Sequence, residues 1–252
     1  MAINVNAVYK TVLLILNKEQ RGYMTPEEFN SIGTQVQLEI FEKYFEDLNQ
    51  QIRIPQTDTD YADRVVNLDE KIAIFKTSGD AQYVPNAISP YWDLPSTNLF
   101  NVPTQFYRLG TVLYNNEIEL QRVDRKEFYH IDRSLLTKPT TAYPVYLYES
   151  NYLYIKPTSI IAPGAIQVDY IRRPINPVWG FDVGTLGQYI YNNNIFNSVI
   201  SPTGSQDFEI HVSEQTELIL KVLLYAGIVI RDPNIIQAAA AQVQAEEINK
   251  KS

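Results

Sequence analysis

The sequence contains no cysteine and only two histidines, His130 and His211. Without cysteine the chain has no disulfide, no thiolate nucleophile and no zinc site built on sulfur. Two histidines are too few for a typical histidine-based metal site unless carboxylates complete the ligand set. We therefore predict no metal and no cofactor, and we expect His211 to take part in the backbone hydrogen bonds of a helix junction.

An excess of positive charge and a long apolar run are also lacking. The chain of 252 residues carries 29 acidic and 21 basic side chains, a net charge of −8. This balance opposes electrostatic capture of nucleic acid or anionic lipid. The longest apolar run, VLLYAGIVI at 222–230, is well short of the roughly 20 residues that span a bilayer. We expect no membrane partner and, because VLLIL at 12–16 has neither a basic start nor a cleavage pattern, no secretion signal.

Motifs of nucleophilic, zinc and nucleotide chemistry are absent from the sequence. Potential acid–base groups gather only in RVDRKEFYHIDR at 122–133, namely Asp124, Glu127, His130 and Asp132. Catalytic carboxylates need desolvation, whereas the basic residues between these groups favour a solvated helical connector. We predict no catalytic residue and no enzyme, with a hydrolase as the third hypothesis.

Helices are predicted in residues 1–84, and the strongest local signal is TPEEF at 25–29. Thr25 can cap a helix, Pro26 suits its first position, and Glu28 completes a capping box. The helix predicted at 26–48 carries a first apolar stripe, Phe29, Ile32, Val36 and Ile40, and a second, Leu38, Phe41, Phe45 and Leu48. Because a surface helix needs only one stripe, the second predicts burial by the rest of the domain or by a neighbouring subunit. A short third helix is predicted at 67–79.

Residues 85–174 predict an antiparallel β-domain, because the apolar period falls to two. Two hairpins are expected, one turning at Asn115 and Asn116, and a further strand follows at 165–174. The second hairpin is rich in tyrosine. Alternation places Tyr146 and Tyr148 on one face, with Tyr152 and Tyr154 opposite them. Such a surface suits a protein interface or, as the alternative function, a carbohydrate- or receptor-binding platform.

Residues 175–210 predict an extended loop or hairpin arm, since glycine, asparagine, serine and proline interrupt every pattern. Residues 211–252 predict two helices that pack on the N-terminal part, the first capped by Ser213 and the second beginning at Asp232–Pro233. The fold class is therefore α+β, in which N- and C-terminal helices form one helical layer with an inserted β-domain and a projecting arm.

The order of these parts resembles the head–tail connector ring proteins of short-tailed bacteriophages, the tail tubular protein A group, and most of all the ring proteins of crAss-like phages. The resemblance is carried by VYKTVLLILNKEQRGYMTPEEFNSIGTQVQLEIFEKYF, LPSTNLFNVPTQFYRLGTV, YPVYLYESNYLYIKPT with IQVDYIRRP, and DFEIHVSEQTELILKVLLYAGIVIRDPNIIQAAA. It implies a ring of about twelve copies that joins the portal to adjacent tail or ring proteins in the virion neck and tail. Double-stranded DNA would pass through its channel without specific binding, and assembly would take place in the bacterial cytoplasm.

Candidate contact residues follow from this reading. The two-striped helix, the alanine run and an arginine pair are hypothesised to form the subunit interface: Leu38, Phe41, Phe45, Ala238, Ala239, Ala240, Ala241, Arg172 and Arg173. The aromatic residues of the arm are hypothesised to contact the next ring: Trp179, Phe181, Tyr189, Tyr191 and Phe196.

Overall fold

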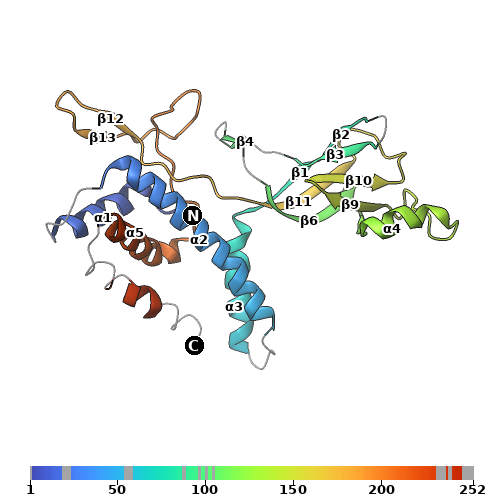
Figure 1. Ribbon diagram of the computed structural model, residues 1–252, viewed down its shortest axis with the longest axis horizontal. Helices are drawn as coiled ribbons and strands as arrows, with labels where there is room; N and C mark the ends of the chain where they lie inside the picture. The colour runs from blue at the N-terminus through green and yellow to red at the C-terminus, as the bar shows by residue number, and fades with distance from the viewer. Residues whose placement is uncertain are drawn as a thin grey trace. The chain divides into compact units, whose positions relative to one another are not determined.

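The computed structural model describes residues 2–18, 24–53, 59–86, 89–95, 98–99, 102–103, 106–230, 237 and 240–245. It has an α+β fold, as the sequence predicted (Figure 1). The chain divides into a helical unit of Met1–Ile74, Phe100–Val102 and Pro174–Ser252, and a β unit of Phe75–Leu99 and Pro103–Arg173. The two ends of the sequence therefore belong to one unit, and the β unit is an insertion in it.

The helical unit is built on α1 (Val5–Lys18), α2 (Pro26–Arg53), α3 (Thr59–Ala73) and α5 (Gln215–Ile230). Helix α5 packs against α1 and α2, and α2 also packs against α3. Buried side chains from all of these helices form the core, among them Val12, Phe29, Val36, Ile72, Leu218 and Val222. Burial of each such side chain contributes about 1.5–3 kcal/mol, which ties the C-terminal helix to the N-terminal pair.

The capping box at the start of α2 is confirmed. The Glu28 carboxylate accepts a hydrogen bond from the Thr25 backbone N–H at 2.9 Å, and the Glu28 N–H donates to Thr25 Oγ1 at 3.3 Å. These reciprocal bonds satisfy amides that have no partner within the helix. The helix ends at Arg53, beyond the predicted end at residue 48.

The third helix differs from its prediction at both ends. The sequence predicted 67–79, whereas α3 spans Thr59–Ala73 and strand β1 (Lys76–Asp80) follows. Strand β1 pairs with a distant strand, from Lys76 opposite Ile171 to Asp80 opposite Gln167. Threonine, serine and glycine in KTSGD are poor helix formers, so this tertiary pairing prevails over the helical pattern that Ile72 and Phe75 suggested.

The β unit is a sandwich of two sheets, one ordered β1-β11-β6-β7 and the other β2-β3-β10-β9-β8. Their inner faces share one core that includes Trp92, Val112, Leu153, Ile166 and Val168. The bounds are β2 (Gln82–Val84), β3 (Tyr91–Asp93), β6 (Phe106–Tyr114), β7 (Ile118–Glu119), β8 (Gln121–Arg122), β9 (Val145–Glu149), β10 (Tyr152–Lys156) and β11 (Ile166–Arg172), with short strands β4 (Asn98–Leu99) and β5 (Val102–Pro103) besides.

Both hairpins turn through residues with positive φ angles, 50° and 59° at Asn115 and Asn116, and 53° and 65° at Ser150 and Asn151. Beyond the first turn, however, the strand divides. Residues of β7 pair with β6, the buried Leu120 crosses between the sheets, and β8 pairs with β9 in parallel. The predicted purely antiparallel domain is therefore corrected to one that contains a parallel pair.

The two chain segments that enter and leave the β unit run side by side. Lys76 lies opposite Ile171 in the register of β1 and β11, and the Arg172 N–H donates to the Phe75 carbonyl at 3.0 Å. A backbone hydrogen bond thus joins the first residue of the β unit, Phe75, to its penultimate residue, Arg172.

The predicted connector at 124–135 is helix α4 (Arg125–His130), followed by a short 3₁₀ turn, η1 (Ile131–Arg133). Before α5, another 3₁₀ turn, η2 (Val212–Glu214), is capped by His211, whose Nδ1 accepts from the Ser213 N–H at 3.3 Å. His211 thus has its predicted junction role, while Ser213 is not the cap that was predicted. The predicted start of the last helix at Asp232–Pro233 lies outside the described residues, and residues 240–245 are helical.

Candidate functional site

The arm formed by residues 175–210 extends from the helices α1 and α2 and contains the hairpin β12 (Phe181–Val183) and β13 (Tyr189–Tyr191) (Figure 1). Both of its ends are held by a single side chain of α2. Gln37, which is 1% exposed, donates from Nε2 to the Ile175 carbonyl at 2.7 Å and accepts from the Glu209 N–H at 3.0 Å. This buried amide closes the base of the arm together with the Glu209 carboxylate, which accepts from the Ile175 N–H at 2.8 Å.

Trp179 provides the second attachment of the arm. Its backbone N–H donates to Asn30 Oδ1 at 2.7 Å, and its indole N–H donates to Asn6 Oδ1 at 3.2 Å. The indole ring lies 4.5 Å from the Tyr9 ring and is 5% exposed. Trp179 is thus an anchor within the chain, which corrects the hypothesis that it contacts the next ring.

Glycine is required where the two sides of the arm approach each other. A Cβ atom on Gly180 would lie 2.2 Å from the Thr203 carbonyl oxygen. The Gly180 N–H donates to Ser205 Oγ at 3.0 Å, and Asn192 Nδ2 donates to Asp182 at 3.1 Å and to Thr203 Oγ1 at 3.0 Å. These contacts, together with the ring contacts of Trp179 with Phe181 and Tyr191, give the arm a defined internal conformation.

The outer part of the arm exposes large apolar side chains to an unusual extent. Leu186 is 90% exposed, Ile200 83% and Val199 76%. Others on the arm are Val183, Tyr189, Ile190 and Ile195. Asp182 is the only charged residue between Pro174 and Gln206. A segment that exposes several large apolar side chains and carries little charge is characteristic of a protein–protein contact.

Sequence reasoning placed the contact residues of the arm on its aromatic side chains. Of these Tyr189 is exposed, whereas Phe181, Tyr191 and Phe196 are half-buried and Trp179 is buried. The aliphatic residues and the anchors Asn30 and Gln37 were missed. A signal for the anchors exists, because two amides seven residues apart lie on one face of a helix whose neighbouring positions are apolar.

The hypothesised subunit interface is corrected at three positions. Phe41 is 1% exposed, Phe45 7% and Arg172 8%, so all three are buried within one chain. The second stripe of α2 is covered because α2 packs against α3 as well as α5. Of the other residues, Leu38 and Ala240 are half-buried, Arg173 and Ala241 are exposed, and Ala238 and Ala239 lie outside the described residues.

The tyrosine-rich hairpin is also corrected. In the register of β9 and β10, Tyr146 lies opposite Ile155 and Tyr148 opposite Leu153. Tyr146 thus faces the core at 5% exposure, and Tyr148 packs at its edge. Tyr152 and Tyr154 occupy the outer face instead. The four rings therefore do not form the single surface that the sequence suggested.

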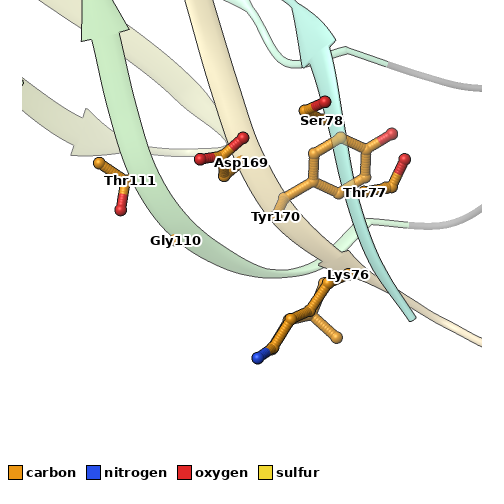
Figure 2. Close-up of a pocket in the computed structure, with 8 residues that line it drawn as sticks. Lys76, Thr77, Ser78, Gly110, Thr111, Asp169 and Tyr170 are labelled. Atoms are coloured by element: carbon orange, nitrogen blue, oxygen red, sulfur yellow. The ribbon is translucent and has the colours of Figure 1, made fainter. Parts of the chain in front are cut away.

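A groove of about 480 Å³ lies between β1, β11 and β6 of the β unit. Figure 2 shows Asp169 between β6 and β11, with Tyr170 beside β1. A Cβ atom on Gly110 would lie 2.8 Å from the Asp169 carbonyl oxygen, so glycine permits this close approach of the strands. The groove offers hydrogen-bonding groups, but no histidine and no pair of carboxylates. Its lining residues are Lys76, Thr77, Ser78, Gly110, Thr111, Asp169, Tyr170 and Ile171.

Buried charges also occur between the helices. Glu217 of α5 is 4% exposed and lies 3.0 Å from Lys43 Nζ and 3.7 Å from Lys221 Nζ. Glu214 pairs in the same way with Lys71 of α3, at 2.5 Å. Each of these carboxylates is matched by an ammonium group, as buried charges require. The network therefore positions the helices relative to one another and does not resemble an acid–base site.

The acid–base candidates of the connector lie in solvent, since Asp124, Glu127, His130 and Asp132 are all exposed. Asp132 pairs with Lys156. Within the described parts of the chain, no group of three or more acidic, histidine or cysteine side chains is arranged to hold a metal ion. None of the described helices has both the length and the apolar character needed to cross a bilayer.

No family model matches the sequence, and no curated protein is significantly similar to it.

Proposed function

We propose that this protein is a structural subunit of an oligomeric ring in a phage neck or tail, where it joins the portal to the tail around the DNA exit channel. The single observation that carries this proposal is the arm. Its base is fixed by Gln37 and Trp179, while Leu186, Val199 and Ile200 are left in water. Pre-ordered apolar surface lowers the entropic cost of association, and this favours a permanent contact with another protein.

The kind of assembly is inferred from the resemblance to connector ring proteins. The contact surface differs from the one that the sequence suggested. The helical stripes are covered within one chain, so the arm takes over the role of contacting neighbours. The low charge of the arm suits an apolar groove on another copy or on an adjacent ring protein. The net charge of −8 suits a channel that DNA must pass without binding.

The proposal is tested by a double variant of the arm, Leu186→Asn with Ile200→Asn. Each residue should contribute about 1.5–3 kcal/mol when a neighbour buries it, so each substitution should weaken assembly roughly tenfold or more. The melting temperature should not change, because both side chains are exposed in the free chain. Native mass spectrometry and electron microscopy of assembled particles would measure the copy number in the ring.

A matched control is available in the β unit, where Leu135 and Leu136 are each 97% exposed. The double variant Leu135→Asn with Leu136→Asn removes as much apolar surface but leaves the arm intact. Assembly should survive this change. Normal rings from the arm variant, or equal loss from both variants, would refute the assignment of the contact to the arm.

A further inference from the structure

Three tyrosine rings gather on the outer face of the five-stranded sheet in the β unit. Tyr91 of β3 lies 4.5 Å from Tyr152 of β10 and 6.5 Å from Tyr154, measured between ring centroids. Leu153 lies between the last two residues and is fully buried on the inner face. Because side chains alternate along a strand, the three tyrosines are fixed on the outside. They are only half-buried there.

Two carboxylates flank this cluster. In the sheet register Tyr152 lies opposite Asp93 on one side and opposite Glu149 on the other. Residues directly opposite each other in an antiparallel pair have Cβ atoms about 5 Å apart and share a face. Asp93, Tyr152 and Glu149 therefore form one row across the sheet. The row places negative charge on both sides of an aromatic ring.

The orientation of the rings distinguishes between possible ligands. The planes of Tyr91 and Tyr152 are tilted by 49°, and those of Tyr91 and Tyr154 by 59°. Rings at these angles do not form the flat surface on which a sugar ring stacks. A cation is attracted to the face of each ring by its quadrupole and needs no common plane. The flanking carboxylates add the matching charge.

The same sheet face already holds one cation in this manner. Lys156 Nζ lies 4.2 Å from the centroid of the Phe128 ring, donates to the Phe128 carbonyl at 2.7 Å and pairs with Asp132. Near the tyrosine cluster, Arg125 approaches Glu149 only to 3.6 Å, and its side chain is 68% exposed. An exposed pair of this kind is weak, so a better-placed guanidinium can join or replace it.

We propose that Tyr91, Tyr152, Asp93 and Glu149 form a binding site for an arginine side chain of a basic protein partner. Arginine fits better than lysine because its planar guanidinium both stacks on aromatic rings and forms forked hydrogen bonds with carboxylates. Partial burial, followed by the charge of Asp93, raises the pKa of the Tyr91 hydroxyl above its usual value. This site is separate from the arm, and the proposal does not depend on the ring assembly.

The test uses the full chain and a short blocked peptide with two arginines spaced by glycine, titrated by NMR. A second peptide with glutamine in place of arginine is the ligand control. The arginine peptide should bind saturably, shift the resonances of Tyr91 and Tyr152, and weaken as salt increases. The glutamine peptide should bind about fivefold more weakly or not at all.

Variants assign the site. Asp93→Asn keeps the shape of the side chain and should weaken the arginine peptide about fivefold, as should Tyr152→Leu. Tyr143→Leu is the matched control, because Tyr143 is 81% exposed on the same unit and its loss should have no effect. Absence of saturable binding, equal binding of both peptides, or full binding by Asp93→Asn would overturn the proposal. Binding of a neutral oligosaccharide that Tyr152→Leu abolishes would assign the face to carbohydrate instead.

Discussion

Replacing Tyr44 with phenylalanine should stabilise the protein, although the tyrosine lies in the core of the helical unit. Tyr44 belongs to α2 and is 3% exposed, and its buried hydroxyl lies near the backbone of His211 without forming a hydrogen bond of good geometry. The Lys71 ammonium lies 5.8 Å from the centroid of the same ring. Phenylalanine keeps this ring and its packing, and removes only the unsatisfied oxygen.

The expected gain follows from the cost of burying a polar group that makes no hydrogen bond. That cost is about 1–3 kcal/mol, so the free energy of unfolding should rise by about 1 kcal/mol near pH 8. A cavity of one hydroxyl group offsets part of the gain.

The gain should increase at alkaline pH. Burial, and after it the charges of Glu214 and Glu217, raise the pKa of Tyr44 well above its usual value of 10. Above pH 10 the Tyr44 hydroxyl loses its proton in the unfolded chain but keeps it in the folded protein. The contribution of Tyr44 to stability is therefore complete below pH 10 and is lost as the pH rises further. The loss is about 1.4 kcal/mol for each pH unit above that value. The advantage of Tyr44→Phe should therefore reach about 2 kcal/mol at one pH unit above 10.

Urea denaturation at pH 8 and again above pH 10, followed by circular dichroism, measures both effects. The other tyrosines titrate in both proteins and cancel in the difference. A variant less stable than the native protein at pH 8, or a difference that does not grow with pH, would refute the reasoning.

Three further predictions concern the base of the arm and the helical unit. Gly180→Ala should destabilise the protein by about 1–3 kcal/mol, because the new Cβ would lie 2.2 Å from a carbonyl oxygen. Urea denaturation measures this loss. Gly187→Ala should cost less, since nothing lies within 4 Å of the new Cβ there, although φ is +79°. Gln37→Met should leave two backbone groups at the base of the arm unpaired, cost about 2 kcal/mol and speed hydrogen exchange of the Glu209 amide; unchanged exchange would deny Gln37 that role. Hydrogen bonding to Glu39 raises the pKa of Tyr225 to about 12, so the stability this bond provides is complete below pH 10 and is lost toward pH 12. Tyr225→Phe should remove one late-titrating group from the tyrosinate absorbance, and a curve that loses an early-titrating group instead would contradict the assignment.

Local chemistry made part of the fold predictable from sequence. The capping box of Thr25 and Glu28 and the turn at Asn115 and Asn116 depend on residues within a few positions of one another, so their sequence signals are complete. Strand β1 depends on a partner about ninety residues away, at 167–171, and nothing near 76–80 indicates that pairing. The passage of the chain from one sheet to the other at Leu120 was missed for the same reason. It depends on the positions of β6 and β9, which belong to different sheets.

The candidate site shows a similar division. The sequence indicated an irregular arm at 175–210, since its turn residues interrupt every regular period, and the strands in this segment are the short β12 and β13. It could not indicate which apolar residues face water. Phe41 and Phe45 looked like surplus apolar surface, but α3 and α5 both pack on their helix. Leu186 and Ile200 looked unremarkable between glycines, serines and asparagines, yet they are the side chains left exposed.

The hydrogen bond between Arg172 and Phe75 bears on how such a chain can diversify. The two ends of the inserted sandwich leave the helical unit as neighbouring strands, with Cα atoms about 5 Å apart. A gene could therefore lose the segment that encodes residues 75–173, or receive a different insertion there, because a short turn would be enough to reconnect the two chain ends. Binding preferences carried by the sandwich can then be exchanged between lineages, while the helices and the arm keep their own contacts.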